Sequence, residues 1–215
     1  MPGDREMIGL EGRDFSRFNG EIDWDKSATT GMKFAWIQSC RGVNSPDDQL
    51  RNNLLGARRN NILVGLYQRV FPDDGGPAEH ARHFMEQWVD IYPELPAVML
   101  PIAVDYEEHI RGGGAWCMEY IRLLRLATGR RNFVVYSMGS MFGVELELAP
   151  IEADPNVHLW VADSGKYTGA TPGNPKFKHP RMIAHQYGKR PLAGATGDID
   201  WNVSTALFPP GGAGC

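Results

Sequence analysis

The sequence predicts an α/β protein built as an irregular (β/α) barrel of the TIM-barrel type, with helices reduced in its C-terminal third. Short apolar runs alternate with longer amphipathic segments, as they do in β/α folds. The helical segments stop near residue 149, and the 215 residues include 25 glycines and 15 prolines, which indicate many turns and loops. An open doubly wound sheet is the alternative, but no G-x-G-x-x-G or P-loop pattern supplies the usual ligand site of that fold.

Eight short apolar runs are predicted to form the strands of the barrel. Their intervals are too irregular for a sequence repeat, which favours a barrel with unequal β/α units. In chain order, the predicted strands are Met7–Phe15, Phe34–Cys40, Ile62–Val70, Leu100–Tyr106, Asn132–Ser137, His158–Ala162, Met182–Tyr187 and Asp198–Trp201.

Five amphipathic segments between the earlier strands are predicted to form helices. Asp47 and Asp48 suit a helix N-terminus, whereas Asn60 and Gly129 are typical of helix ends. In chain order, the predicted helices are Asp23–Thr30, Asp47–Asn60, Ala78–Tyr92, Ala115–Thr128 and a short one at Ser140–Glu147.

These elements are predicted to form a single domain over residues 1–207. The tail Phe208–Cys215 has the sequence F-P-P-G-G-A-G-C, which is typical of the start of a linker. We therefore expect residues 208–215 to lie outside the folded domain, where they could lead to a second module in a longer product.

Composition excludes several classes of protein. The formal charge of −4 gives no electrostatic reason to approach nucleic acid or an anionic membrane. The longest apolar runs, such as Pro96–Val104, are far shorter than the roughly 20 residues that cross a bilayer, and Met1–Gly9 has no apolar core of a signal peptide. Three cysteines without a C-x-x-C pair favour free thiols over a disulfide framework, a zinc site or redox chemistry.

A pair of acidic residues lies at the end of the fourth predicted strand. Asp105 and Glu107 are two residues apart, so on a strand they face the same side with Cα atoms roughly 6.5–7 Å apart. Two carboxylates in one pocket do not both ionise readily, so we expect the pKa of one of them to rise and that group to become a general acid. Glu107 is the better candidate because its side chain is longer. The alternative is that Asp105 caps the loop and Glu107 is a solvated charge.

Two further aspartates lie near the first and the last strand. Asp14 stands at the end of the first predicted strand, and we place Asp200 at the end of the last. In a closed barrel these strands are neighbours, and the C-terminal strand ends of such barrels carry the active site. Asp14 and Asp200 would then complete a bowl of four carboxylates with Asp105 and Glu107. For either aspartate alone, a turn or capping role is the alternative.

Short motifs run in a fixed order along nearly the whole chain. Gly12–Ser16 and Phe18–Trp24 form the opening, and Asp105–Glu107 forms a D-x-E. The other motif segments are Phe34–Ile37, Val64–Tyr67, Thr128–Gly129, Val135–Ser137, Leu159–Ala162, Gln186–Tyr187 and Gly197–Asn202. Over about residues 9–205, their order and spacing resemble those of the glycoside hydrolase family 25 lysozymes, or N-acetylmuramidases, which carry G-x-D-V-S, W-Q-G-x-I-D-W, V-G-x-Y and D-x-E segments.

The resemblance implies an activity and roles for the acidic residues. It implies a flattened barrel that cleaves the β-1,4 bond from N-acetylmuramic acid to N-acetylglucosamine in bacterial peptidoglycan, with net retention and no metal or other cofactor. Glu107 would be the general acid, Asp105 and Asp200 would orient and polarise the reacting groups, and Asp14 would complete the acidic floor. The substrate's own 2-acetamido oxygen would be the nucleophile, held by Asp105, while Glu107 protonates the leaving oxygen and then deprotonates water.

The resemblance also implies substrate-binding side chains. Tyr67 and Tyr136 stand where the family places aromatic groups near the reacting sugar; the alternative for each is a strand aromatic with a hydrogen-bonded hydroxyl. Trp160, Gln186 and Tyr187 are the other residues implied to contact the substrate.

Three strand ends depart from the family pattern. The chain has Tyr67-Gln68-Arg69 for Y-H-F, Arg41 in place of the acidic residue of K-A-T-E-G, and His185 for the tryptophan of W-Q-Y. These departures leave the acidic residues intact but alter the surroundings of the substrate. They motivate the alternative of a non-catalytic peptidoglycan-binding or structural module on the same barrel. A glycosidase of this architecture that acts on chitin-like polymers is a third hypothesis.

The cellular setting is inferred from the resemblance and the polar N-terminus. A wall hydrolase without a signal peptide suggests a phage endolysin that is made in the host cytoplasm and reaches the cell wall through a separate pore. A non-classically exported autolysin is the alternative. We expect a monomer whose partners are peptidoglycan glycan strands.

Overall fold

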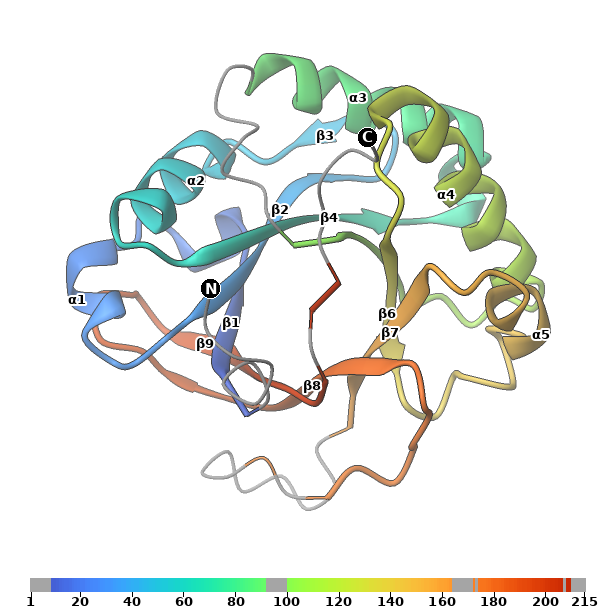
Figure 1. Cartoon of the computed structure of the whole chain (residues 1–215). Coiled ribbons are helices and arrows are strands. Elements are labelled where there is room, and N and C mark those ends of the chain that lie inside the picture. Colours follow the sequence, from blue (N-terminus) through green and yellow to red (C-terminus); the bar gives the residue numbers. More distant parts are fainter. Residues whose placement is uncertain (1–8, 92–99, 164–171, 173, 207, 210–215) are drawn as a thin grey trace.

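The computed structural model describes residues 9–91, 100–163, 172, 174–206 and 208–209. Figure 1 shows the arrangement of its strands and helices. The strands are β1 (Glu11–Phe15), β2 (Phe34–Arg41), β3 (Ser45–Pro46), β4 (Leu63–Val70), β5 (Ile102–Tyr106), β6 (Phe133–Met138), β7 (Val157–Ala162), β8 (Met182–Pro191) and β9 (Asp198–Ser204). The α-helices are α1 (Trp24–Ala28), α2 (Leu50–Arg59), α3 (Pro77–Asp90), α4 (Gly113–Thr128) and α5 (Leu148–Glu152).

The sheet closes into a barrel. The hydrogen-bonded order is β1-β9-β8-β7-β6-β5-β4-β2, and β1 also pairs with β2, which completes the ring; β3 adds a short edge to β2. Neighbouring strands of the ring are parallel except at β9, which is antiparallel to both β1 and β8. The predicted irregular α/β barrel is confirmed. Its irregularity comes from β8 and β9, which follow each other as a hairpin instead of being joined by a helix.

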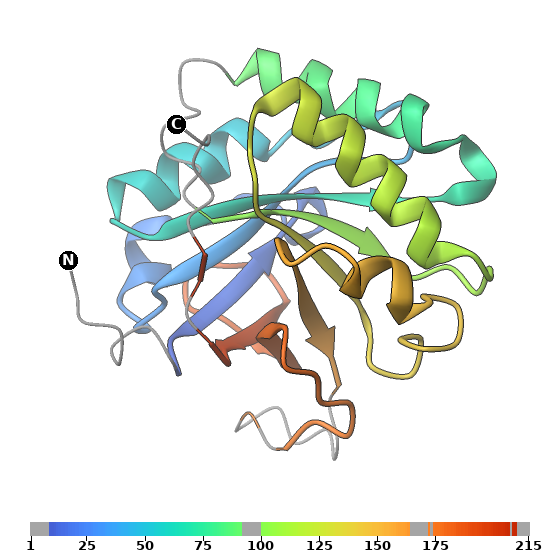
Figure 2. The same cartoon turned by 45° about the vertical axis from the view of Figure 1, so that its right-hand side comes forward.

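The helices cover one side of the barrel. In Figures 1 and 2, α2, α3 and α4 lie over the outside of the early strands, whereas β8 and β9 lie on the opposite side. After α5 ends at Glu152, the described residues contain no further helix. The predicted loss of helices from the C-terminal third is therefore confirmed.

One predicted helix is absent. Residues Ser140–Glu147 form turns with an isolated bridge between Phe142 and Leu146, and the helix α5 begins only at Leu148. Gly143 adopts a φ of 83°, a left-handed conformation that ends a helix. Among the other predictions, Met7 and Tyr92 lie outside the described residues.

The hydrophobic core has two layers, one outside the barrel wall and one inside it. The outer layer lies between the strands and the helices and includes Phe15, Leu54, Phe84 and Leu124. The inner layer fills the barrel with side chains that alternate along each strand with those of the outer layer. Its members are Phe34, Trp36, Tyr67, Leu100, Ala103, Val134, Tyr136, Trp160, Ile183 and Ala184.

Two indole rings cross the middle of the barrel. Trp36 and Trp160 stack with ring centroids 4.5 Å apart and planes inclined by 18°. Glycine makes room for them, because a Cβ at Gly65 would lie 2.4 Å from the indole nitrogen of Trp36. The indole N–H of Trp36 donates to the carbonyl of Pro101, so this buried polar group has a partner.

Phe208, which we assigned to the tail, packs into the barrel. Its ring meets those of Phe34 and Trp36 edge-on, with centroid distances of 4.8 and 5.7 Å. The folded domain thus includes Phe208, because an aromatic ring at this position covers the apolar end of the barrel interior. The tail from residue 210 onward lies outside the described residues.

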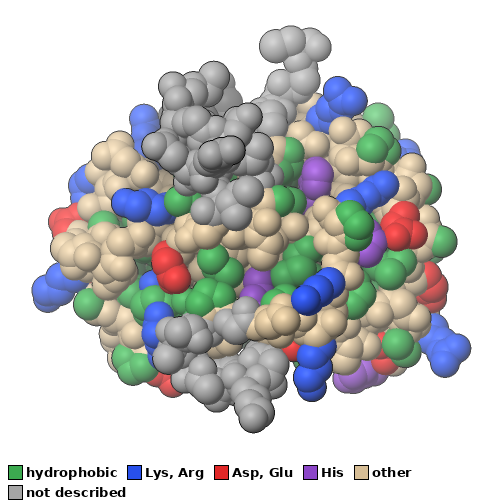
Figure 3. Space-filling model, turned by 60° about the horizontal axis from the view of Figure 1, so that its bottom comes forward, with side chains coloured by type: hydrophobic (Ala, Val, Ile, Leu, Met, Phe, Trp, Pro, Cys, Tyr) green, Lys and Arg blue, Asp and Glu red, His purple; other side chains and the backbone are tan. Residues whose placement is uncertain are grey.

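Figure 3 shows one face of the molecule. In the part of the face of Figure 3 that the structure describes, basic and acidic side chains are spread around the margin, and neither sign forms a single patch. Among the described helices, none is long and apolar enough to cross a lipid bilayer.

Candidate active site

A cavity of about 340 Å³ opens at the carboxyl ends of the parallel strands. All four predicted carboxylates lie in its wall: Asp14 from β1, Asp105 from β5, Glu107 just after β5, and Asp200 from β9. The other lining residues are Ser16, Phe18, Gln38, Arg41, Tyr67, Arg69, Tyr136, Trp160 and Gln186. The barrel therefore brings together acidic residues that lie far apart in the sequence.

Asp200 reaches this cavity in an unexpected way. It is the third residue of β9 and not its end, so the predicted position within the strand was wrong. Because β9 is antiparallel, its beginning lies at the same end of the barrel as the ends of the parallel strands. Asp14 and Asp200 are direct partners across the pair β1–β9, so the two carboxylates face the cavity side by side.

Two amide side chains hold Asp14. Its Oδ2 accepts hydrogen bonds from Gln186 Nε2 at 2.9 Å and from Asn202 Nδ2 at 2.8 Å. Each amide is oriented in turn, because Tyr136 donates its hydroxyl to Gln186 Oε1 and Trp160 donates its indole N–H to Asn202 Oδ1, both at 2.7 Å. Sequence analysis missed Asn202, although it lies two residues after Asp200 and hence on the same strand face.

The aspartates of the cavity hold their protons more tightly than free aspartate does. Desolvation raises the pKa of Asp14 well above its ordinary value, the charge of Asp200 adds to this, and the bonds from the two amides oppose it. Burial and the neighbouring Glu107 likewise raise the pKa of Asp105. Burial raises the pKa of Asp200, and the charge of Lys189 opposes this rise. Burial in the cavity is thus the main cause of all three shifts.

Asp105 and Glu107 meet at one nitrogen of a guanidinium, Nη1 of Arg69, and burial together with the charge of Glu107 raises the pKa of Asp105. Asp105 is buried, whereas about a third of the Glu107 side chain, 31%, is exposed. The pair thus has one buried member and one that a molecule in the cavity can contact.

Arg69 lies against this acidic pair. Its guanidinium forms ion pairs with Asp105, with Glu107 and with Glu108, at N···O distances of 3.1, 2.5 and 2.8 Å. Sequence analysis noted Arg69 only as a departure from the family pattern. The spacing of Arg69 could have identified it as a cavity residue. It follows Tyr67 by two residues on a strand, so the two side chains face the same side.

Two tyrosines line the cavity as predicted. Burial raises the pKa of both Tyr67 and Tyr136 well above the ordinary value, and nearby carboxylates add to the rise. Both hydroxyls therefore remain protonated and can serve as hydrogen-bond donors. The hydroxyl of Tyr136 already donates to Gln186.

The other three residues predicted to contact the substrate differ in their position relative to the cavity. Gln186 lines the cavity and is partly exposed. Trp160 also borders the cavity but is almost fully buried, so it forms the floor. The structure does not bring Tyr187 to the cavity, because its ring is buried and its hydroxyl donates to the carboxylate of Glu11.

The three departures from the family pattern have different surroundings. Gln68 is buried and points away from the cavity, where it bonds to the Gly42 carbonyl and the Tyr120 hydroxyl. His185 is buried, with its Nε2 2.6 Å from the carbonyl of Asp163. Arg41 lines the cavity, and so does Arg69, which belongs to the same departure as Gln68.

The rim of the cavity carries an exposed aromatic ring. Phe18 is 66% exposed and lines the opening. The guanidinium of Arg41 lies 5.6 Å from the centroid of this ring and 4.8 Å from that of Phe71. An exposed ring beside an arginine suits a sugar or peptide group that has both apolar and anionic parts.

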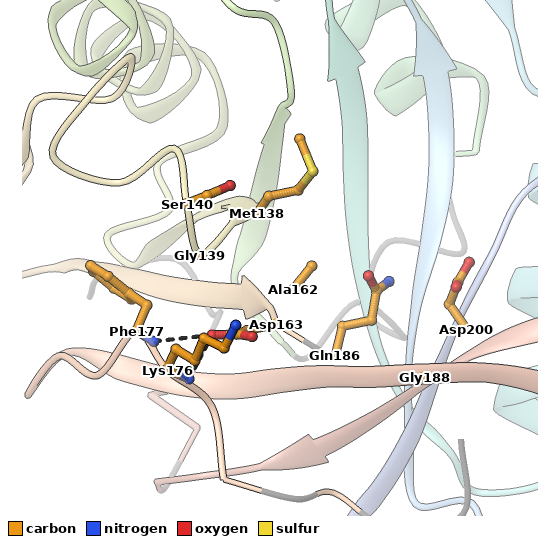
Figure 4. Close-up of a pocket in the computed structure, with 10 residues that line it drawn as sticks. All are labelled: Met138, Gly139, Ser140, Ala162, Asp163, Lys176, Phe177, Gln186, Gly188 and Asp200. Atoms are coloured by element: carbon orange, nitrogen blue, oxygen red, sulfur yellow. Dashed lines mark hydrogen bonds between the residues drawn. The ribbon is translucent and has the colours of Figure 1, made fainter. Parts of the chain in front are cut away.

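A second cavity of about 430 Å³ adjoins the first, since Gln186 and Asp200 line both. Figure 4 shows these two side chains projecting into the same space from neighbouring strands. On its far side, Asp163 accepts the backbone N–H groups of Lys176 and Phe177. The two cavities together provide room for more than one sugar unit.

The arrangement favours general acid–base hydrolysis. It combines an accessible carboxyl group beside a buried one, further carboxylates that can stabilise positive charge, and hydroxyl donors at fixed positions. Among the described residues, no group of three or more His, Cys, Asp or Glu side chains is arranged to hold a metal ion.

Comparison with known proteins gives a consistent result. The family model described as glycosyl hydrolases family 25 matches residues 13–194. Lysozyme M1 of Streptomyces globisporus is 29% identical over 100 residues, which are 45% of this chain but only 34% of that protein. The match thus spans about a third of the length of this relative.

Solved structures share the fold over nearly the whole chain. The lysozyme from Streptomyces coelicolor has a TM-score of 0.73 and 22% identity and covers 93% of both chains. The catalytic domain of endolysin Ply40 from bacteriophage P40 of Listeria monocytogenes has a TM-score of 0.74 and 18% identity, with 91% of this chain and 93% of that chain covered. With the match of the family model over most of its length, the chain belongs to family 25 of the glycosyl hydrolases.

Proposed function

We propose that this chain is a muramidase that hydrolyses the β-1,4 bond between N-acetylmuramic acid and N-acetylglucosamine in bacterial peptidoglycan, with retention of configuration. The observation that carries the proposal is the convergence of four carboxylates from three parts of the barrel on one cavity, where Asp105 and Glu107 both contact Arg69. The names of its relatives, lysozymes and an endolysin, support this substrate.

Glu107 is the general acid and base in this proposal. It protonates the glycosidic oxygen as the bond to the leaving sugar breaks, and it later takes a proton from the attacking water. Its partial exposure and its position beside the buried Asp105 support both steps.

Asp105 holds the 2-acetamido group of the substrate, whose oxygen attacks the anomeric carbon. This substrate-assisted path replaces the enzyme nucleophile of ordinary retaining glycosidases. The oxocarbenium-like transition state carries positive charge, which Asp14 and Asp200 stabilise from the floor of the cavity. The hydroxyls of Tyr67 and Tyr136 donate to the sugar nearest the reacting carbon.

The test is the release of reducing ends from purified bacterial walls. We expect Glu107→Gln to lower the rate by roughly 10²–10⁴-fold, because the glutamine cannot donate the proton. Asp105→Asn should also lower it strongly. The matched control is Glu119→Gln, which changes an exposed carboxylate paired with Arg122 outside the cavity and should leave the rate unchanged.

The outcomes separate the alternatives. Wall binding without new reducing ends would show a non-catalytic module. Faster hydrolysis of chitin oligomers than of walls would show a chitin-type glycosidase. Full activity of the Glu107→Gln variant would remove the assigned acid.

We also propose the setting of an endolysin: a monomer made in the host cytoplasm that acts on the glycan strands of the cell wall. The similarity to the catalytic domain of a phage endolysin supports this setting. Expression in host cells should cause lysis only when a pore-forming protein is co-expressed, and light scattering should give the mass of one chain. Export and lysis without the pore would contradict the proposal.

A further inference from the structure

Arg69 is a charged group in the cavity that the proposed mechanism does not use. It lies near the end of β4, and its side chain is only 13% exposed. One of its nitrogens, Nη1, contacts both Asp105 and Glu107, and the other, Nη2, contacts Glu108. A single guanidinium therefore binds all three acidic residues at the end of β5 and just after it.

The position of this guanidinium is fixed from several sides. Arg69 and Asp105 are direct partners in the pairing of β4 with β5. The ring of Phe71 lies 5.1 Å from the guanidinium carbon. A planar guanidinium held in this way has rigid donor directions, unlike the ammonium of lysine. It can therefore restrict the orientation of the Glu107 carboxyl.

The charges around the acidic pair make this contact important. Asp14 from β1 and Asp200 from β9 face the pair with negative charge, and Glu108 follows it in the chain. The hydroxyls of Tyr67 on β4 and Tyr136 on β6 are neutral donors. Arg41 from β2 lies at the rim. Among the described residues, Arg69 is the cation that forms ion pairs with both members of the pair.

We propose that Arg69 is the positioning residue of the acid pair: it fixes the direction in which Glu107 delivers its proton and sets the upper pH limit of activity. The inference rests on the proposed muramidase function. Arg69 acts through Glu107 and has no direct contact with the reacting bond in this proposal.

The direction of the pH effect follows from charge. A cation 2.5–3.1 Å from the two carboxyls favours their ionised forms. Without it, the pair keeps its proton to higher pH. Because the alkaline limb of kcat/KM marks the loss of the general acid's proton, this limb should move to higher pH when Arg69 is neutralised.

The experiment compares Arg69→Gln, Arg69→Lys and the control Arg122→Gln in the reducing-end assay over a pH series. For Arg69→Gln, we expect kcat at the optimum to fall roughly 10–100-fold with KM nearly unchanged, because a misdirected acid slows the reaction without weakening binding. Its alkaline limb should move up by about one pH unit or more. Arg69→Lys should keep the limb near its original pH but lose part of kcat. Arg122→Gln, at an exposed ion pair, should match the wild type.

A double variant tests whether Arg69 acts through the acid. In Glu107→Gln, adding Arg69→Gln should cause no further loss, whereas a general structural role would lower the rate again. Thermal melting shows whether each variant is folded; if Arg69→Gln is not, Arg69→Lys carries the test.

Several results would overturn the proposal. An unchanged kcat and pH profile in Arg69→Gln would do so, as would a loss confined to KM, which would make Arg69 a substrate contact. For the lysine variant, an unchanged kcat would show that the guanidinium geometry is irrelevant. Absence of hydrolysis by the wild-type chain would instead reject the proposed function itself.

Discussion

The two ends of the barrel interior are built from the same strands but have opposite chemistry. At one end, Phe34, Leu100 and Phe208 fill the interior with apolar side chains that are packed against each other. At the other end, aspartates with raised pKa values surround an open cavity. The first end gains free energy of folding from burial, whereas the second loses some because carboxylates are desolvated. The comparison shows that burial of apolar side chains at one end offsets the unfavourable desolvation of carboxylates at the other.

The stacked indoles link the two ends. Trp36 packs against Phe208 on one side and against Trp160 on the other. Trp160 then donates its indole N–H to Asn202, which in turn holds Asp14. The apolar layer therefore also sets the orientation of an acidic residue in the cavity.

The largest expected effect in this comparison is that of Trp36→Ala. Removal of a fully buried indole from the middle of the barrel should lower the free energy of unfolding by about 3–5 kcal/mol, since it leaves a large void. Urea denaturation measures this loss. The control is Leu126→Ala on α4, whose side chain is 74% exposed and should matter little. A loss below about 1 kcal/mol for Trp36→Ala would mean that the layer does not support the fold.

The next effect is that of Gly65→Ala, which adds volume to the same layer. The new Cβ would lie 2.4 Å from the Trp36 indole nitrogen and 3.1 Å from the Leu100 Cβ, so the ring must move. We expect a loss of about 1–3 kcal/mol in the same denaturation experiment. In the Trp36→Ala background the substitution should be much less harmful. Equal losses in both backgrounds would show that the indole is not the obstacle.

The smallest expected effect is an increase in the free energy of unfolding, and it comes from a substitution at the acidic end of the barrel. Because the folded protein raises the pKa of Asp14 above its ordinary 3.8, ionisation of Asp14 opposes folding, and the wild type loses stability as pH rises above that value. Asp14→Asn removes this loss and keeps an oxygen for both amide donors. We expect a gain of roughly 1 kcal/mol at pH 7 that vanishes near pH 4, together with reduced wall hydrolysis.

The control for this prediction is an aspartate with the opposite shift. Asp25 is exposed, and hydrogen bonds from Asn60 and Arg59 lower its pKa, so Asp25→Asn should give no gain at pH 7. Thermal melting at pH 4 and pH 7 measures both variants. A gain for Asp14→Asn that is equal at the two pH values would contradict the electrostatic explanation.

Much of the fold was predictable because the barrel strands leave a strong apolar pattern. Each predicted strand has a counterpart in the structure, and the expected adjacency of the first and last strands is confirmed. The direction of β9 was not predictable in the same way, because local patterns do not encode whether a strand runs parallel or antiparallel. Gly143 explains the wrongly predicted helix at Ser140–Glu147, since its left-handed conformation interrupts the segment.

The site was predictable in its acidic residues but not in their partners. Asp14, Asp105 and Glu107 stand at or just after the ends of parallel strands, which the fold class alone makes significant. Asp200 reaches the same end of the barrel from the beginning of the antiparallel β9. The hydrogen bonds of Asn202 and the ion pairs of Arg69 depend on which strands are neighbours. Tyr187 was predicted to contact the substrate because it belongs to a motif. In the structure, its hydroxyl donates to Glu11 instead, away from the cavity. Which side chains bond to each other depends on the tertiary structure, and the linear sequence pattern does not specify it.

The closure of the ring by β9 has a consequence for synthesis on the ribosome. The bond between Asn202 and Asp14 joins residues 188 positions apart, and β1 gains its second neighbour only when β9 has left the exit tunnel. The nascent polypeptide therefore cannot assemble its acidic floor until β9 has been synthesised. A chain that stops before β9 would lack Asp200 and the amide of Asn202 that holds Asp14.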